Sequence, residues 1–286
     1  MEIIKMHGLG NDFVFFDRFY DQGTAGETEE NYPELARKLC HRQFGVGADG
    51  LIVVLPSETA DARMRIFNPD GSEPEMCGNG IRCFARYIYD KDYVRKDTIK
   101  AETLAGNLTL HLTIEEGEVK GVRVDMGEPI LRPGLIPVLA QTEPVVGAKL
   151  EVNGQVYQYT AVSMGNPHCV LFINDYAKLD FDHLGPAIEK HELFPRKTNV
   201  EFVRIDSPKE ITMKVWERGA GPTLACGTGA CASVVASVLN QKIERAATVH
   251  LPGGDLWIEW SQDNHVYMTG PATYVFKAQI LDDKLA

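Results

Sequence analysis

The sequence predicts two similar domains, each rich in β-strands and each containing one long buried helix. A Cys-Gly-x-Gly motif occurs twice, at Cys77-Gly78-Asn79-Gly80 and at Cys226-Gly227-Thr228-Gly229, about half the chain apart. Each motif opens an apolar stretch, and the rest of each half alternates strand-like runs with glycine-containing turns. A chain of 286 residues is long enough to bury two separate cores. These observations together predict a duplicated fold.

The helix that follows each motif is expected to lie in a core. Residues 230–239 are small, apolar and almost free of charge, and a helix that is apolar on all sides is normally buried. After the first motif, Ile81, Phe84, Ala85 and Ile88 recur at helical spacing. Both motif cysteines are therefore expected at the mouth of a buried helix.

The start of a helix gives a cysteine a distinct chemistry. The two glycines of each motif permit a tight turn and let a ligand approach the backbone N–H groups. Free N–H groups at a helix N-terminus carry partial positive charge, so they attract a carboxylate and favour thiolate over thiol at Cys226. A single cysteine beside glycine is more often a small buried hydrophobic residue. The repetition of the motif favours the functional interpretation.

Charge and cysteine usage exclude several classes of protein. The chain has 29 Lys and Arg residues against 40 Asp and Glu residues, a formal net charge of −11, which argues against binding to nucleic acid or to an anionic membrane surface. We therefore expect a small-molecule ligand. The N-terminus lacks a signal-peptide core and no apolar run approaches membrane-spanning length, so a cytoplasmic protein is expected. Six cysteines without Cys-x-x-Cys spacing predict neither a disulfide framework nor a metal site.

The first half is expected to hold seven strands and one further helix. Residues 33–40 carry proline in the first turn and apolar side chains on one face, which predicts a short amphipathic helix. A polar loop is expected over 21–31. The turn sequence Asn68-Pro69-Asp70-Gly71 places Asn68 close to the loop of Cys77. The strands are expected at 3–6, 13–16, 51–55, 62–67, 98–103, 108–114 and 119–126.

Residues 127–144 hold four prolines and little periodicity, and we interpret them as the crossing into the second domain. Beyond them a helix is expected over 183–192, and Asn240 is an acceptable stop for the helix of Cys226. The last strand is expected to return to the first domain, because a duplicated sheet needs its edges covered. The strands of this half are expected at 156–163, 169–173, 200–205, 211–215, 249–251, 256–260, 266–269 and 274–281. The domains are therefore placed at 1–122 plus 271–286 and at 123–270.

Five short motifs, in this order and spacing, resemble the diaminopimelate epimerase family, and the resemblance runs from the first strand to the last. It implies an α+β fold of two domains, each a curved, mostly antiparallel sheet around a central helix, with the active site in the cleft between them. The family interconverts LL- and meso-2,6-diaminopimelate in lysine and peptidoglycan precursor biosynthesis, without pyridoxal phosphate or metal. The motifs are Met6-His7-Gly8-Leu9-Gly10-Asn11-Asp12-Phe13, Cys77-Gly78-Asn79-Gly80, Ser163-Met164-Gly165-Asn166-Pro167-His168, Glu217-Arg218-Gly219-Ala220-Gly221 and Ala225-Cys226-Gly227-Thr228-Gly229.

The resemblance also implies residue roles. Cys226 is expected as proton acceptor and Cys77 as proton donor in the LL-to-meso direction, with no cofactor and no metal. The backbone N–H groups at Gly78-Asn79 and Gly227-Thr228 are expected to hold the substrate α-carboxylate. His168 and Glu217 are expected to modulate the thiol pKa values, and a homodimer is expected. The remaining binding positions that match the family are Asn11, Asn68, Asn166, Asn199, Glu217 and Arg218.

One position departs from the family pattern, and the other cysteines are assigned to packing. Gly50 stands where some members carry a substrate-binding glutamine. The cysteines expected in cores are Cys40, Cys83, Cys169 and Cys231.

Two alternatives stay open at this point. One is another cofactor-independent racemase or isomerase of the same architecture, such as a proline or hydroxyproline racemase or an aconitate-type isomerase. The diacid-matching Glu217-Arg218-Gly219 segment argues against a cyclic substrate. The other is a thiol redox protein in which Cys77 and Cys226 form a switching disulfide, which the missing Cys-x-x-Cys spacing disfavours.

Overall fold

A computed structural model describes residues 1–20 and 31–281, so nearly all of the loop expected over 21–31 lies outside the described residues. Contacts divide the chain into two compact units, Met1–Val124 with Gly270–Ala286, and Asp125–Thr269. In the part of the chain that is described, no helix is long and apolar enough to cross a membrane.

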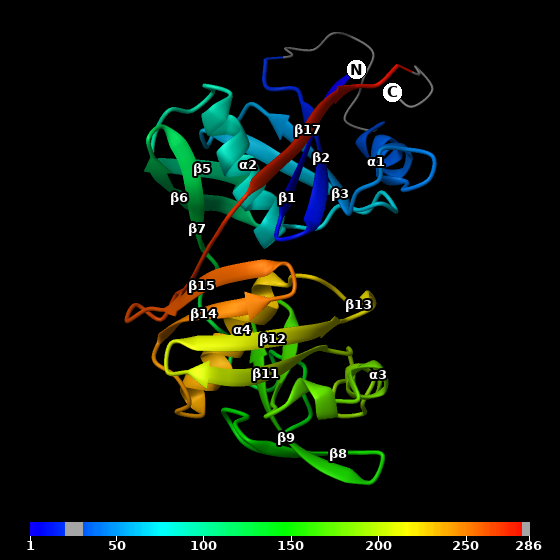
Figure 1. Ribbon diagram of the computed structural model, residues 1–286, viewed down its shortest axis with the longest axis vertical. Coiled ribbons are helices and arrows are strands. Elements are labelled where there is room, and N and C mark those ends of the chain that lie inside the picture. Colours follow the sequence, from blue (N-terminus) through cyan, green and yellow to red (C-terminus); the bar gives the residue numbers. More distant parts are fainter. Residues whose placement is uncertain (21–30, 282–286) are drawn as a thin grey trace. The chain divides into compact units, whose positions relative to one another are not determined.

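In its described residues, the first unit is one mostly antiparallel sheet with two helices. Its described strands follow the order β17-β1-β2-β3-β4-β5-β6-β7, and only the neighbours β2 and β3 and the neighbours β4 and β5 run parallel. The last strand, β17, pairs with β1, so the chain returns to the first unit as expected (Figure 1). The bounds are β1 Glu2–Gly8, β2 Asn11–Asp17, β3 Gly50–Leu55, β4 Ala62–Phe67, β5 Thr98–Thr103, β6 Gly106–Glu115, β7 Glu118–Asp125 and β17 Thr273–Gln279.

Helix α2, Gly78–Asp90, is the central helix of this unit and contacts β1, β2, β3, β4 and β6. The residues expected at helical spacing, Ile81, Phe84, Ala85 and Ile88, are all fully buried. Helix α1, Tyr32–Cys40, begins one residue before the expected start and packs on β3 and β4. The first unit therefore has its cysteine motif at the entry to a core helix.

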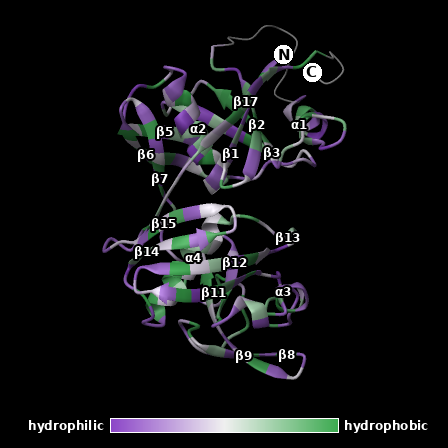
Figure 2. Ribbon diagram, in the orientation of Figure 1, coloured by the Kyte–Doolittle hydropathy of each residue, from purple (hydrophilic) through white to green (hydrophobic). Residues whose placement is uncertain are grey.

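The second unit repeats this arrangement. Its described strands follow the order β8-β9-β10-β11-β12-β14-β15-β16, with short β13 pairing at the side of β12. Buried and more exposed residues alternate along β12 and β14, and Figure 2 shows the corresponding alternation of hydropathy. The bounds are β8 Ala148–Val152, β9 Gln155–Ser163, β10 Pro167–Phe172, β11 Asn199–Ser207, β12 Glu210–Glu217, β13 Gly221–Pro222, β14 Ala246–Leu251, β15 Gly254–Trp260 and β16 Val266–Gly270. Strand β8 was not expected from the sequence.

Helix α4, Gly227–Leu239, is the central helix of the second unit and contacts strands β9 to β12, β14 and β15. Helix α3, Phe181–Glu189, joins the parallel strands β10 and β11 and ends earlier than expected. It closes a second core against β8 to β11, through Leu184 and Ile188. The single-turn helix η2, Tyr176–Lys178, precedes it.

The two units have the same strand topology. Reading each sheet from β17 or from β8, the pairings are antiparallel, antiparallel, parallel, antiparallel, parallel, antiparallel and antiparallel. In both sheets the central helix joins the second parallel pair. The prediction of two similar α+β units, each a mostly antiparallel sheet with one central helix, is confirmed.

Candidate active site

Cys77 and Cys226 occupy the same position in their two helices. Each is the N-cap residue of a 13-residue helix, and each has extended backbone angles, φ −137° and ψ 120° at Cys77 and φ −121° and ψ 108° at Cys226. The N–H of Gly80 donates to Cys77 Sγ at 3.5 Å, and the N–H of Gly229 donates to Cys226 Sγ at 3.4 Å. The sulfur of each cysteine thus takes the place that a side-chain oxygen usually has at an N-cap.

Asn11 and Asn79 lie beside Cys77. The Cys77 thiol donates to Asn11 Oδ1 at 3.7 Å, and Asn79 Nδ2 donates to the same oxygen at 3.1 Å. Asn11 is itself held by Asp49, whose Oδ2 accepts from Asn11 Nδ2 at 2.8 Å. Because its neighbouring oxygen accepts a hydrogen bond, Cys77 is held in a geometry that suits the protonated thiol.

Arg82 fixes the turn that carries Cys77, and sequence reasoning missed it. Its guanidinium is fully buried and donates to Gly78 O at 2.9 Å, to Asn79 Oδ1 at 2.9 Å and to Pro271 O at 3.2 Å. The signal was available: an arginine inside an apolar helical stretch must find buried acceptors.

Asn68 does not join the Cys77 group through its described hydrogen bonds. Its Nδ2 donates to Ser72 Oγ at 2.9 Å, and its backbone closes the turn with Ser72 and Gly71. Asn68 therefore lies in the turn at the end of β4.

Asn166, His168 and Thr228 gather around Cys226. The sulfur lies 3.5 Å from Thr228 Oγ1, which accepts from Asn166 Nδ2 at 3.2 Å. Asn166 Oδ1 lies 3.0 Å from His168 Nε2. His168 is fully buried, and its Nδ1 lies 2.6 Å from Oε1 of Glu201, a residue that the sequence did not indicate.

The side chain of Asn199 is hydrogen-bonded to the backbone of Arg218. The buried Asn199 side chain donates to Pro167 O at 3.0 Å and accepts from the Arg218 N–H at 2.8 Å. The Arg218 side chain is exposed and donates to Arg196 O at 3.3 Å. Glu217 is partly buried and accepts from Thr223 Oγ1 at 2.5 Å. The Arg218 guanidinium is thus positioned by its main chain and accessible to a ligand.

Comparisons with known proteins agree along the whole chain. The family profile described as diaminopimelate epimerase matches residues 3–131 and 160–275. The chain is 72% identical over 286 residues to the diaminopimelate epimerase of Desulfitobacterium hafniense, covering 100% of both chains. It is 56% identical to that of Pelotomaculum thermopropionicum, covering 98% of both. The chain belongs to the diaminopimelate epimerase family.

Solved structures with much lower identity share the fold of this diaminopimelate epimerase family member. A phenazine biosynthesis protein of the PhzF family from Bacillus anthracis matches with a TM-score of 0.71 at 16% identity, covering 99% of both chains. A probable proline racemase from Agrobacterium radiobacter K84 matches with a TM-score of 0.69 at 15% identity, covering 98% of this chain and 93% of that one. These matches support the duplicated α+β fold and nothing more specific.

Gly50, the position that departs from the expected pattern, is closely packed. It begins β3 and is buried, and an added Cβ would lie 3.0 Å from Phe67 O and 3.3 Å from Phe13 Cδ1. A side chain at this position would require these neighbours to shift by a few tenths of an ångström.

The expected lowering of the Cys226 pKa is wrong for this state of the site. Burial raises the pKa of Cys226 well above its ordinary value, and the charge of Glu217 raises it further. The Thr228 hydroxyl and the Gly229 N–H oppose this but do not outweigh burial. The helix N-terminus thus moderates a desolvated thiol and does not by itself create a thiolate.

The remaining cysteines of this epimerase-family chain are placed as packing residues. All four are buried, and burial raises the pKa of Cys40 and of Cys83 to about 12 and that of Cys169 well above its usual range. Thiols held this way are inert. Within residues 1–20 and 31–281, no group of three or more His, Cys, Asp or Glu side chains could hold a metal ion.

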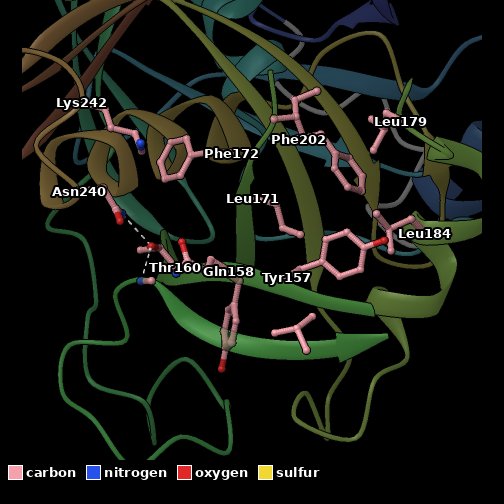
Figure 3. Close-up of a pocket in the computed structure, with 14 residues that line it drawn as sticks. Tyr157, Gln158, Thr160, Leu171, Phe172, Leu179, Leu184, Phe202, Asn240 and Lys242 are labelled. Carbon is pink, nitrogen blue, oxygen red and sulfur yellow. Dashed lines mark hydrogen bonds between the residues drawn. The ribbon is translucent and has the colours of Figure 1, made fainter. Parts of the chain in front are cut away.

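A hollow of about 390 Å³ in the second unit lies away from this chemistry. Figure 3 shows Phe172 and Lys242 on one side of it, and Thr160 hydrogen-bonded to Asn240. Asn240 is the C-cap of α4, so this part of the hollow is at the opposite end of the helix from Cys226. None of the expected site residues lines this hollow.

Proposed function

We propose that this chain interconverts LL- and meso-2,6-diaminopimelate, with Cys226 as proton acceptor and Cys77 as proton donor in the LL-to-meso direction. Family membership supports the substrate. The observation that carries the mechanism is the matched N-cap geometry of the two cysteines, each with a backbone N–H on its sulfur. Inverting a carbon centre requires one group that takes a proton from one face and another that supplies a proton to the opposite face.

The surroundings of the two sulfurs support the direction of this assignment. The Cys77 thiol donates to Asn11, which favours the protonated form needed in an acid. Both sulfurs accept a backbone N–H, and Cys226 also lies 3.5 Å from the Thr228 hydroxyl, whose donation to the sulfur would favour the thiolate needed in a base. The Cys226 thiolate takes the α-proton, and the carbanion takes the thiol proton of Cys77. The cycle leaves a Cys226 thiol and a Cys77 thiolate, which catalyse the reverse direction.

The substrate supplies a positive charge that lowers the pKa of Cys226, which is raised in the free protein. Glu217 raises the pKa of Cys226, and an ammonium group of the substrate paired with Glu217 offsets that charge. The ammonium also places a positive charge near the sulfur. Binding the substrate therefore lowers the pKa of Cys226 and makes the base at the moment it is needed.

The other expected residues take binding or positioning roles. The N–H groups of Gly78, Asn79, Gly227 and Thr228 bind the α-carboxylate at the two helix starts, where charge develops in the transition state. Arg218 binds the distal carboxylate through its planar fork. Asn11, Asn166 and Asn199 bind the substrate through their side-chain amides, and their hydrogen bonds connect them to Cys77, Thr228 and Arg218. Asn68, which lies in the turn at the end of β4, also binds the substrate through its side-chain amide. No cofactor or metal is part of this proposal.

The decisive experiment follows α-deuterium incorporation from D2O into LL- and meso-diaminopimelate by mass spectrometry. The wild-type protein is expected to label both, and Cys77→Ser and Cys226→Ser are expected to lose epimerisation by several orders of magnitude, because a serine hydroxyl is a far weaker acid. Cys83→Ala and Cys231→Ala, in the same two helices, serve as matched controls and should retain activity. Full activity in either motif variant, or no labelling by the wild type, would overturn the proposal.

We also propose that the protein acts in the cytoplasm as a homodimer, in the biosynthesis of lysine and of peptidoglycan precursors. The family assignment supports this setting. Size-exclusion chromatography with light scattering tests the dimer, and a single peak at the monomer mass would contradict it.

A further inference from the structure

Glu201 is a buried carboxyl group that the proposed reaction does not use. It lies on β11 in register with Val170 of β10, is fully buried, and its Oε1 lies 2.6 Å from His168 Nδ1. Its Oε2 is buried without a hydrogen-bond partner among the described residues. A carboxyl group held in this way is costly, so its presence calls for an explanation.

The hydrogen bonds of Asn166 decide which nitrogen of His168 carries a proton. Asn166 Nδ2 donates to Thr228 Oγ1, which turns Asn166 Oδ1 toward His168 Nε2 at 3.0 Å. Since that oxygen can only accept, Nε2 must donate. The contact between Nδ1 and Glu201 Oε1 then requires one shared proton, because two lone pairs would repel at 2.6 Å.

Glu201 and His168 therefore form a pair without net charge. Either the carboxylic acid donates to a neutral imidazole or an imidazolium donates to a carboxylate, and the sum of charges is zero in both. Burial raises the pKa of Glu201, which favours the first form. The other ionisable groups that act on the pair or on Cys226 are Glu217 on β12 and the thiol of Cys169 on β10.

The same chain continues to the sulfur of Cys226. Thr228 Oγ1 accepts a hydrogen bond from Asn166 Nδ2, so the hydroxyl proton of Thr228 can point at Cys226 Sγ, 3.5 Å away. If the Asn166 amide were flipped, its oxygen would accept the hydrogen bond from the Thr228 hydroxyl, and the sulfur would lose this donor. The direction of each hydrogen bond thus depends both on the proton at the Glu201–His168 contact and on the orientation of Asn166.

We propose that Glu201 is a positioning residue for Cys226: it fixes His168 with its Nε2 proton toward Asn166, so that Thr228 donates to the sulfur and stabilises the thiolate. Glu201 touches no reacting atom and acts only through the hydrogen bonds that connect it, by way of His168, Asn166 and Thr228, to Cys226. The inference rests on the proposed role of Cys226 as the base.

A competing role for Glu201 predicts the opposite sign. If Glu201 acted as a free negative charge, Glu201→Gln would make the thiolate of Cys226 easier to form. If it acts through the chain, Glu201→Gln changes little, because the glutamine amide donates to His168 Nδ1 and the pair stays neutral. Glu201→Leu removes the donor and leaves the thiolate harder to form.

The test measures the rate of Cys226 alkylation by iodoacetamide against pH, followed by peptide mass spectrometry, which needs no turnover. At pH 8 we expect Glu201→Gln within about twofold of wild type, and Glu201→Leu and Thr228→Val each slower by about tenfold, as for one hydrogen bond to a charged group. Thr228→Ser should restore the rate. The double variant Glu201→Leu with Thr228→Val should be alkylated no more slowly than either single variant, because both substitutions interrupt the same chain of hydrogen bonds.

Thr160→Val is the matched control, since it removes another buried threonine hydroxyl of this unit, at the far end of α4. It should leave Cys226 alkylation unchanged. Faster alkylation in Glu201→Gln, or additive losses in the double variant, would overturn the inference. If Glu201→Leu does not fold, the alkylation rates of Glu201→Gln, Thr228→Val and Thr228→Ser still test the inference. Loss of the deuterium exchange proposed above would refute the reaction without altering this order of alkylation rates.

Discussion

Gly229 leaves the space that the carboxyl group of Glu201 occupies, since a Cβ added at Gly229 would lie 2.8 Å from Glu201 Oε1 and 3.2 Å from Cys226 Sγ. The corresponding glycine of the first unit, Gly80, meets apolar atoms instead, the nearest being Ile52 Cδ1 at 3.2 Å. The two motifs thus share their backbone and differ in what supports them. The first turn of the Cys226 helix packs against the ionisable side chain of Glu201, whereas the first turn of the Cys77 helix packs against Ile52 and Ile66.

This difference predicts unequal tolerance to an added methyl group. Gly229→Ala should destabilise the protein by about 1–3 kcal/mol, because the buried carboxyl is held by His168 and cannot retreat. Gly80→Ala should cost less than about 1 kcal/mol, because the end of an isoleucine side chain can move. Urea denaturation of both variants measures this, and equal losses would contradict the rigid placement of Glu201.

Glu217 should control the pH at which Cys226 becomes reactive. Its carboxylate raises the pKa of Cys226, so Glu217→Gln should lower that pKa and speed alkylation of the free protein near pH 8. The same variant should lose epimerase activity, because the substrate ammonium loses its partner. Alkylation rates measured between pH 7 and pH 10 decide the point, and unchanged or slower alkylation would remove Glu217 from the environment of Cys226.

Arg218 should determine recognition of the second carboxylate. Arg218→Ala should lower kcat/KM by about two to three orders of magnitude, equivalent to roughly 2–4 kcal/mol of transition-state binding. Arg218→Lys should recover little of this, because a point charge does not reproduce the planar fork. Arg196→Ala is the control, since it removes a neighbouring exposed cation while the carbonyl that Arg218 contacts remains. Steady-state kinetics with wild-type values for Arg218→Ala would exclude the role.

Arg82 should matter for both stability and activity. Arg82→Met removes the donor to the buried Asn79 Oδ1 and to Gly78 O, which should cost about 1–3 kcal/mol. The turn at Asn79 should also loosen, so kcat should fall. Arg37→Met, on the surface of α1, is the comparison and should change the free energy of unfolding by less than about 1 kcal/mol. Denaturation and kinetics that match between the two variants would show that Arg82 does not organise the turn.

Much of the fold could be predicted from the sequence because its signals are local. The repeated cysteine motif, the helical spacing after it and the glycine turns located both central helices and nearly all of the strands. Strand β8, Ala148–Val152, escaped because the proline-rich segment before it hid the return to strand structure. Helix α3, Phe181–Glu189, begins two residues and ends three residues before the expected bounds of 183–192.

The site could be predicted less completely, because its supports come from distant strands. Glu201 sits in a strand where a glutamate normally faces water, and only the parallel pairing of β10 with β11 brings it to His168. The pKa of Cys226 depends on how deeply the folded chain buries the thiol, which no local pattern reports. Motifs identify the reacting groups, whereas tertiary packing sets their protonation.

The position of β17 has a consequence for the linear order of the chain. In the second unit, strands β8 and β9 are joined by a tight hairpin at Asn153-Gly154, both residues having positive φ. In the first unit the equivalent hairpin is interrupted: Gln279 lies opposite Glu2, although the two belong to the last and the first strands. A circular permutant that joins β17 to β1 through an Asn-Gly turn and opens after Thr269 would encode each unit contiguously. The chain therefore consists of two tandem repeats, except that the strand that would begin the first repeat, β17, lies at the end of the sequence.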